Sequence, residues 1–207
     1  MSDGAALPEV VTEAIVVIDL VESTLTSNLF GWYAVGRQGL RDLRALIGEV
    51  GADQGLRCLK STGDGYLVTF HNPHSAEMAA ICAIESVFEL LDRIATRNNA
   101  VSEERALNLR CAVHLGEVDV VADDREGPHV SLAFRLDDIT RASLPAALNP
   151  IPPEEFPLRN YVLCSEEVAG ILERRSAQWD LRSIGLLKLK GFPGWREVFW
   201  VVPEAAA

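Results

Sequence analysis

Two aspartates of this 207-residue chain occur at the ends of apolar segments, where acidic side chains are uncommon. Asp19 comes near the end of the β-branched segment AIVVIDL at 14–20, which predicts a buried strand. Asp64 lies in Thr-Gly-Asp-Gly between the strand-like segments LRCLKS and GYLVTF, and Asp-Gly readily takes the positive φ angles of a tight turn. Hard divalent cations prefer oxygen ligands, so two carboxylates at neighbouring strand ends would suit Mg²⁺ or Mn²⁺.

The segment after Asp19, Leu-Val-Glu-Ser-Thr at 20–24, is typical of a turn that leads to a helix. Free backbone N–H groups in such a turn can hold phosphate oxygens. Paired metal ligands beside a phosphate cradle indicate phosphoryl chemistry. A simpler interpretation stays open for each aspartate, because an Asp after a strand is often a cap and Asp-Gly is often only a turn.

The apolar periodicity predicts an alternating order of strands and helices. We expect strands at 14–20, 56–61, 65–70, 107–121 (one long strand or a pair), 161–165, 186–190 and 197–202, helices at 30–50, 75–97, 130–142 and up to 175, and a proline-rich loop at 145–157. This order is typical of an α+β, ferredoxin-like domain whose helices cover one face of a mostly antiparallel sheet. We expect one domain, 13–207, after an N-terminal extension, 1–12. The first strand would then lie beside the hairpin and bring the two aspartates together.

The composition limits the partners that the protein is expected to bind. The net charge of −11 argues against a nucleic-acid partner, but a nucleotide substrate stays possible because metal ions supply positive charge locally. The four cysteines are widely spaced without a Cys-x-x-Cys pair, which predicts buried free thiols rather than a zinc or redox site. The N-terminus lacks the order of a signal peptide, and no apolar segment approaches the ~20 residues of a membrane span. We therefore expect a cytoplasmic protein without a membrane partner.

Five segments resemble, in order, the motifs of class III adenylate and guanylate cyclases. They are IDLVEST, LKSTGDGYLVTF, LRCAVHLGEV (with Ala112 in place of the usual glycine), GPHVSLAFRL and LLKLKGFPGWREVFWV. They are distributed from residue 18 to residue 201, almost the whole chain.

The resemblance implies a role for each matching position. Asp19, Asp64 and the backbone carbonyl of Leu20 would hold two Mn²⁺ or Mg²⁺ ions. Arg135 matches the arginine that stabilises the transition state, for which a planar guanidinium is well suited, although a solvated helical arginine is the plain alternative. The residues around the first aspartate would bind the substrate: Ile18, Val21, Glu22, Ser23 and Thr24.

Lys60 and Asp124 match the positions that read the base edge in purine cyclases. Lys60 has the alternative of a surface lysine. Asp124 has the alternative of a solvated acidic loop, in which Asp123 could take its place. The family builds each site from two subunits, so the resemblance also implies a homodimer with two composite sites.

Several positions depart from the family pattern. Ser131 replaces a catalytic asparagine and is too short to span the same gap, Phe192 stands where some relatives have a triphosphate-contacting lysine, and His129 and Phe134 are bulkier than usual. An aromatic group follows the phosphate turn, and packing is its plain alternative: Phe30, Trp32 and Tyr33.

These departures resemble the stand-alone pyrimidine cyclases of Pycsar antiphage systems. That resemblance implies conversion of UTP, or of CTP, to a cyclic nucleotide that activates a separate effector. An adenylate cyclase that makes cAMP is the alternative enzyme. A catalytically inactive domain that binds a nucleotide or a partner is the alternative from another class.

Overall fold

The computed structural model describes residues 8–21, 36–176 and 178–204. Its strands are β1 (Glu9–Leu20), β2 (Leu56–Ser61), β3 (Gly65–Phe70), β4 (Leu109–Val121), β5 (Asp124–Glu126), β6 (Tyr161–Ser165), β7 (Trp179–Leu187) and β8 (Arg196–Pro203). Its α-helices are α2 (Arg37–Gly51), α3 (Ala76–Asn98), α4 (Pro128–Asp137) and α5 (Glu166–Arg175), and 3₁₀ helices span Glu103–Arg105, Arg141–Ala146 and Pro153–Glu155.

One sheet organises the described residues, with strand order β2-β3-β1-β4-β6-β8-β7 and β5 added to β4. The pairing of β4 with β6 is parallel, and the other neighbouring strands pair antiparallel. The predicted α+β class and mostly antiparallel sheet are therefore confirmed. The predicted position of the first strand is also confirmed, because β1 lies between the hairpin strand β3 and β4.

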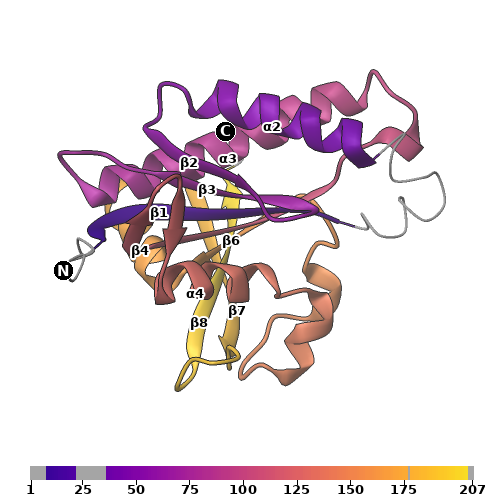
Figure 1. The fold of residues 1–207 in the computed structure, drawn as a ribbon. Coiled ribbons are helices and arrows are strands. Elements are labelled where there is room, and N and C mark those ends of the chain that lie inside the picture. Colours follow the sequence, from indigo (N-terminus) through magenta and orange to yellow (C-terminus); the bar gives the residue numbers. More distant parts are fainter. Residues whose placement is uncertain (1–7, 22–35, 177, 205–207) are drawn as a thin grey trace, which may run out of the picture.

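Helices cover both faces of the sheet, so the prediction of one covered face is wrong. Figure 1 shows α2 and α3 on one side and α4 on the other. The reason lies in β1, which is apolar on both faces and therefore needs cover on both. Val16 and Ile18 belong to the core under α2 and α3, whereas Ile15 and Val17 pack with residues of α4.

Several predicted boundaries are wrong where pairing decides the ends of strands. β1 begins at Glu9 rather than at 14, because its pairing with β4 starts at Glu9 opposite Val120. β7 covers Trp179–Leu187 instead of 186–190, since it pairs with the whole length of β8. The helix expected at 130–142 is α4, which starts at Pro128 and ends at Asp137. The helix expected from residue 30 lies partly outside the described residues and is observed from Arg37.

The four cysteines are free, as predicted. Cys58, Cys111 and Cys164 are buried, and Cys82 is half-buried on α3. Burial raises the pKa of the Cys111 thiol well above its ordinary value, so this thiol stays protonated and unreactive. None of the described helices has the length and apolarity needed to cross a membrane.

Candidate functional site

The end of β1 lies very close to the β2–β3 hairpin. Asp19 faces Gly65 across the β1–β3 pair, and a side-chain carbon on Gly65 would lie 2.1 Å from the carbonyl oxygen of Ile18. Only glycine permits this approach. The positive φ of the turn falls on Gly63 (111°) rather than on the Asp-Gly pair, which corrects the expected turn chemistry. The backbone N–H of Leu20 donates to the carbonyl oxygen of Asp64 at 3.4 Å, so the hairpin tip is fixed beside Asp19.

The carboxyl groups of Asp19 and Asp64 meet, as the sequence predicted. The pKa of Asp19 is raised to about 6, mainly because the group is partly buried, and the nearby Asp64 adds to this through its charge and a side-chain hydrogen bond. Arg110 acts in the opposite direction and lowers this pKa. Two adjacent, partly dehydrated carboxyl groups attract a cation, so the donor chemistry fits a divalent metal ion.

The set of ligands is small. Among the described residues, no group of three or more His, Cys, Asp or Glu side chains could hold a metal ion. Mg²⁺ commonly uses one or two carboxylates and takes its other ligands from water and substrate phosphates. Asp19, Asp64 and the carbonyl of Leu20 fit this pattern, in which the protein supplies only part of the coordination shell.

Arg110 on β4 lies beside this pair, and we did not predict it. Its Nη2 is 2.5 Å from Oδ2 of Asp19, and its Nε is 3.3 Å from Oδ2 of Asp137 at the end of α4. Burial raises the pKa of Asp137 to about 7 although Arg110 lowers it. The register of β1 with β4, which sets Asp19 opposite Arg110, could have revealed the first contact. The contact with Asp137 depends on how α4 packs, which the sequence did not indicate.

The predicted phosphate turn is only partly described. The N–H of Val21 donates to the carbonyl oxygen of Asn108 at 2.8 Å. We had expected this N–H to be free for a phosphate oxygen, and it is not. The side chain of Ile18 is buried in the core, which leaves only its backbone for a substrate contact. Glu22, Ser23 and Thr24 lie outside the described residues.

Lys60 and Asp124, far apart in the sequence, form a side-chain ion pair. Asp124 begins the short strand β5, where we had expected an acidic loop, because Val121 and Asp124 pair across the turn. Asp124 is therefore the acid that meets Lys60. The pair raises the pKa of Lys60 and lowers that of Asp124, mainly through their hydrogen bond, so both groups are charged.

A buried ion pair, which we did not predict, fixes β5 on the sheet. Arg125 donates through Nε and Nη2 to the two carboxylate oxygens of Glu13, at 2.7 and 3.1 Å. Both side chains are almost fully buried. Bidentate geometry of this kind holds a strand in one position, and it sets Asp124 beside Lys60.

Ser131 and Arg135 lie four residues apart on α4, so they share one face of the helix. Pro128 follows Gly127 at the start of the helix, a favoured position because proline lacks the N–H that would be unpaired there. The Ser131 hydroxyl donates to the carbonyl oxygen of Gly127 at 3.3 Å, and Arg135 pairs with Asp138 at 2.8 Å. In one chain, therefore, both predicted catalytic side chains have partners within α4 and the residue after it.

No protein-family model matches the chain. Over 88 residues, 42% of its length, the chain is 38% identical to a Rhizobium meliloti (strain 1021) protein assigned as adenylate cyclase 3, and this match spans 14% of that protein. An adenylate/guanylate cyclase/hydrolase from Silicibacter pomeroyi superposes with a TM-score of 0.70 at 23% identity, covering 95% of this chain and 99% of that one. The non-canonical dimeric guanylyl cyclase domain of the RhoGC fusion protein from the aquatic fungus Blastocladiella emersonii gives a TM-score of 0.70 at 14% identity, covering 94% and 98%.

The chain has the fold of adenylate and guanylate cyclase catalytic domains. At these identities the solved structures show the fold alone. The paired carboxylates of Asp19 and Asp64 thus lie in a cyclase fold, at the end of its central strand β1.

One departure from the cyclase motifs, His129, has a structural explanation. His129 stacks with the buried His114, with 2.8 Å between Nδ1 and Nε2, and His114 also contacts the Ser165 hydroxyl at 2.8 Å. A side-chain carbon on Gly116 would collide with the His129 ring, so this glycine makes room for it. Burial lowers the pKa of His114 to about 4, which keeps the ring neutral.

The other departures are aromatic. Phe134 packs against the core between β1 and α4, and Phe192 packs against the core beside β7 and β8, where it also lies under the Arg196 guanidinium. The residues Phe30, Trp32 and Tyr33 lie outside the described part of the chain.

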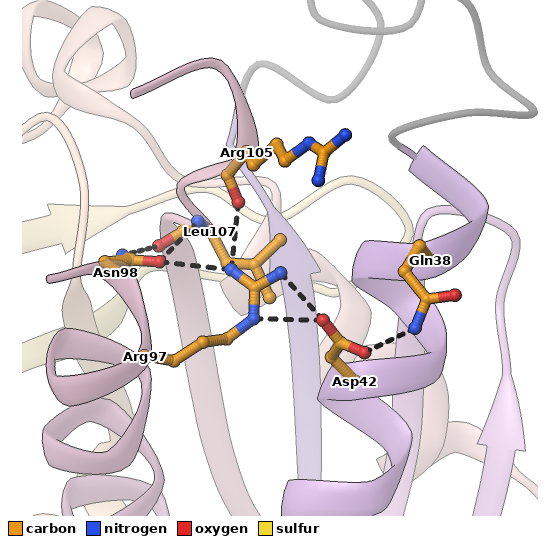
Figure 2. Close-up of polar contacts among 6 residues, drawn as sticks. All are labelled: Gln38, Asp42, Arg97, Asn98, Arg105 and Leu107. Carbon is orange, nitrogen blue, oxygen red and sulfur yellow. Dashed lines mark hydrogen bonds and ion pairs between the residues drawn. The ribbon is translucent and has the colours of Figure 1, made fainter. Parts of the chain in front are cut away.

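A second polar network connects α2, α3 and the segment that leads into β4 (Figure 2). Arg97 donates to Oδ2 of Asp42 through Nε (3.1 Å) and Nη2 (2.7 Å), and to the carbonyl oxygen of Arg105 at 2.9 Å. Gln38 donates to the other oxygen of Asp42 at 2.7 Å. Asn98 both donates to and accepts from the backbone of Leu107. This network fixes the approach to β4.

Proposed function

We propose that this chain is a nucleotide cyclase, which converts a nucleoside triphosphate into a 3′,5′-cyclic nucleotide and pyrophosphate. The observation that carries the proposal is the pairing of Asp19 with Asp64 at the end of β1, in a fold shared with adenylate and guanylate cyclase domains. The 3′-oxygen would form a new bond to the α-phosphorus as the bond from that phosphorus to the pyrophosphate oxygen breaks.

Divalent ions bound at such carboxylates lower the pKa of the attacking hydroxyl and neutralise the triphosphate. Asp19 and Asp64 would supply the charged donors and the Leu20 carbonyl a neutral one. Arg135 would present its planar guanidinium to the charge that develops on the phosphoryl oxygens. Ser131 lies on the same face and would add a short hydroxyl donor. The task of these residues is positioning and charge stabilisation, without a covalent intermediate.

A homodimer with composite sites is part of the proposal. Arg135 and Ser131 have partners on their own helix in one chain, and a cyclase domain of the same fold is dimeric. Mixing inactive Asp64→Ala with inactive Arg135→Ala should restore activity, because one of the two sites in the heterodimer then has every group intact. Absence of recovery after demonstrated subunit exchange would contradict composite sites.

For the substrate, we propose a pyrimidine nucleotide, UTP in preference to CTP. The product, cUMP, would be the signal of an antiphage system, and it would activate a separate effector in the cytoplasm. The motive is the short Ser131 in place of an asparagine, together with the resemblance of the segment GPHVSLAFRL at 127–136. Uracil offers two carbonyl acceptors to a donor such as Lys60, whereas a carboxylate such as Asp124 would accept from the amino group of cytosine.

The second candidate is an adenylate cyclase, and a specific observation favours it. Lys60 and Asp124, which match the base-reading positions of purine cyclases, lie in direct contact. An ammonium donor next to a carboxylate acceptor complements the N1 and amino edge of adenine. The matched Rhizobium meliloti protein is assigned as an adenylate cyclase as well.

One assay tests the cyclase and its base together. Purified protein receives ATP, GTP, CTP and UTP in equal amounts with Mn²⁺, and chromatography with mass spectrometry identifies the cyclic products. Predominant cUMP supports the pyrimidine proposal, and a pocket sized for one ring would discriminate in kcat/KM. Equal turnover of ATP and UTP would reject it in favour of the adenylate cyclase. Without any cyclic product, the inactive nucleotide-binding domain would be the better description.

A further inference from the structure

Arg110 lies between two carboxylates that come from different elements. Asp19 is at the end of β1, Asp137 is the last residue of α4, and Arg110 extends from β4 toward both. The three side chains are exposed by 14%, 8% and 24%, so water screens their charges only partly. One cation is therefore shared by two acids in a semi-buried site.

The two contacts of Arg110 are unequal. The 2.5 Å contact with Asp19 is a hydrogen bond, whereas Nε lies 3.3 Å from Asp137 without the alignment of one. Arg110 Nε and Asp137 Oδ1 are both buried without a hydrogen-bond partner in the protein. A buried polar group left in this way costs about 1–3 kcal/mol, so a small shift of Arg110 toward Asp137 would be favourable.

Two other polar side chains near Arg110 have partners of their own. Tyr161 is its neighbour across the parallel β4–β6 pair, but the Tyr161 hydroxyl donates to the carbonyl oxygen of Ile139 at 3.0 Å. Asp138 pairs with Arg135 on the exposed side of α4. Asp137 is therefore the acid placed to accept Arg110 when the bond to Asp19 breaks.

We propose that Asp137 is a positioning residue that holds Arg110 away from Asp19 when a divalent cation binds there; this rests on the metal role proposed for Asp19 and Asp64. A cation on the Asp19 carboxylate competes with the guanidinium for the same oxygens. In the described part of the chain, Arg110 forms ion pairs with Asp19 and Asp137 alone, so without Asp137 the displaced guanidinium would return to Asp19. Asp137 thus makes the carboxylate of Asp19 available, and Arg110 stays in the site as a preset positive group.

Mn²⁺ binding tests this without any catalytic readout. Free Mn²⁺ is measured by electron paramagnetic resonance in a titration of the full chain, wild type and five variants: Asp137→Asn, Arg110→Met, the double variant, Asp138→Asn and Asp64→Ala. We expect Asp137→Asn to weaken binding by about tenfold and Arg110→Met to tighten it. In the Arg110→Met background, Asp137→Asn should change the Kd by less than about twofold, because the competing cation is gone.

The matched control is Asp138→Asn, which removes the same charge one residue away without touching Arg110. An equal loss from Asp137→Asn in both backgrounds would indicate a through-space charge effect and overturn the proposal, as would no loss in the wild-type background. Circular dichroism and thermal melts of each variant confirm that it is folded. If Asp64→Ala binds Mn²⁺ as well as the wild type does, the proposed metal site itself is wrong, an outcome distinct from failure of the Asp137 role.

Discussion

Two arginines of this molecule each face a buried or half-buried aspartate, and their surroundings differ. In the α2–α3 network, both oxygens of Asp42 accept hydrogen bonds, and Arg97 donates to a carboxylate and to a backbone carbonyl (Figure 2). Beside the end of β1, Asp137 Oδ1 and Arg110 Nε are buried without a hydrogen bond, although Nε lies 3.3 Å from Oδ2 of Asp137.

This difference separates a structural network from the candidate site. A saturated network has one best arrangement, so it holds α2, α3 and the approach to β4 in place. A site with spare donors and acceptors has more than one favourable arrangement, and it can exchange partners when a ligand arrives. The pKa values reflect the same shortage of partners. Burial raises the pKa of Asp19 to about 6 and that of Asp137 to about 7, and the Arg110 guanidinium that they share lowers both by less.

The largest expected effect is the loss of activity on removing a carboxylate from the candidate site. Asp64→Ala should reduce cyclic-nucleotide formation by about 1,000-fold or more, since several kcal/mol of charge stabilisation depend on the metal ligands. Asp19→Asn should behave alike, because an amide lacks the carboxylate charge. Product formation is measured with Mn²⁺ in excess, and melting curves establish that the variants are folded. Near-normal turnover by Asp64→Ala would contradict the proposed role of Asp64 as a metal ligand.

The structural network should respond in stability and not in chemistry. Arg97→Ala removes the partner of Asp42, and breaking this partly buried pair should lower the free energy of unfolding by about 2 kcal/mol. For a chain of this size, that corresponds to a melting temperature lower by about 4–8 °C. Turnover below the melting range should stay within about twofold of wild type.

Arg93→Ala is the matched control on the same helix. Arg93 pairs with Glu49 and Glu89 at the surface, where it is 42% exposed, so its loss should cost less than about 1 kcal/mol. If Arg97→Ala and Arg93→Ala lower the free energy of unfolding equally, the hydrogen-bonded network around Arg97 does not stabilise the fold more than a surface ion pair does.

The last expected effect is a gain in stability that depends on pH. The folded-state pKa of Asp137 is raised from 3.8 to about 7, so its contribution to stability is fully present below about pH 4 and is lost progressively as the pH rises to about 7. Asp137→Asn removes this pH-dependent loss of stability, because an amide does not ionise. Without metal, the advantage of the variant should be smallest near pH 4 and should grow by about 1–3 kcal/mol between pH 5 and pH 8. Urea unfolding at both pH values in EDTA measures the difference. A variant less stable than the wild type at pH 8 would contradict a raised pKa of Asp137.

The sequence predicted those parts of the site that local patterns determine. The apolar run before Asp19 and the Gly-Asp-Gly turn predicted the β1 end and the hairpin, and the order of the strands predicted their meeting. Positions that depend on packing between distant elements were not predicted. Asp137 meets Arg110 only through the way α4 lies on the sheet, and Glu13 meets Arg125 only because β5 exists.

The errors in the fold have related causes. β5 has three residues, too few for any periodicity to indicate it. The second covered face was missed because a run such as AIVVI at 14–18 reads as buried without revealing how many helices cover it. The phosphate turn was expected to have free N–H groups, but Val21 donates to Asn108, a contact set by the start of β4.

The sheet order has a consequence for how the chain folds. β1 pairs along its whole length with β4, which lies about a hundred residues later, so this central pairing closes a long loop and forms slowly. At a synthesis rate of about 5–20 residues per second, β1 is available for roughly 5–20 s before β4 has been made. Its first partner is β3, which pairs Ala14–Asp19 with Gly65–Phe70. The earliest cooperative unit on the ribosome would therefore already hold Asp19 beside Asp64, before the strands that complete the sheet exist.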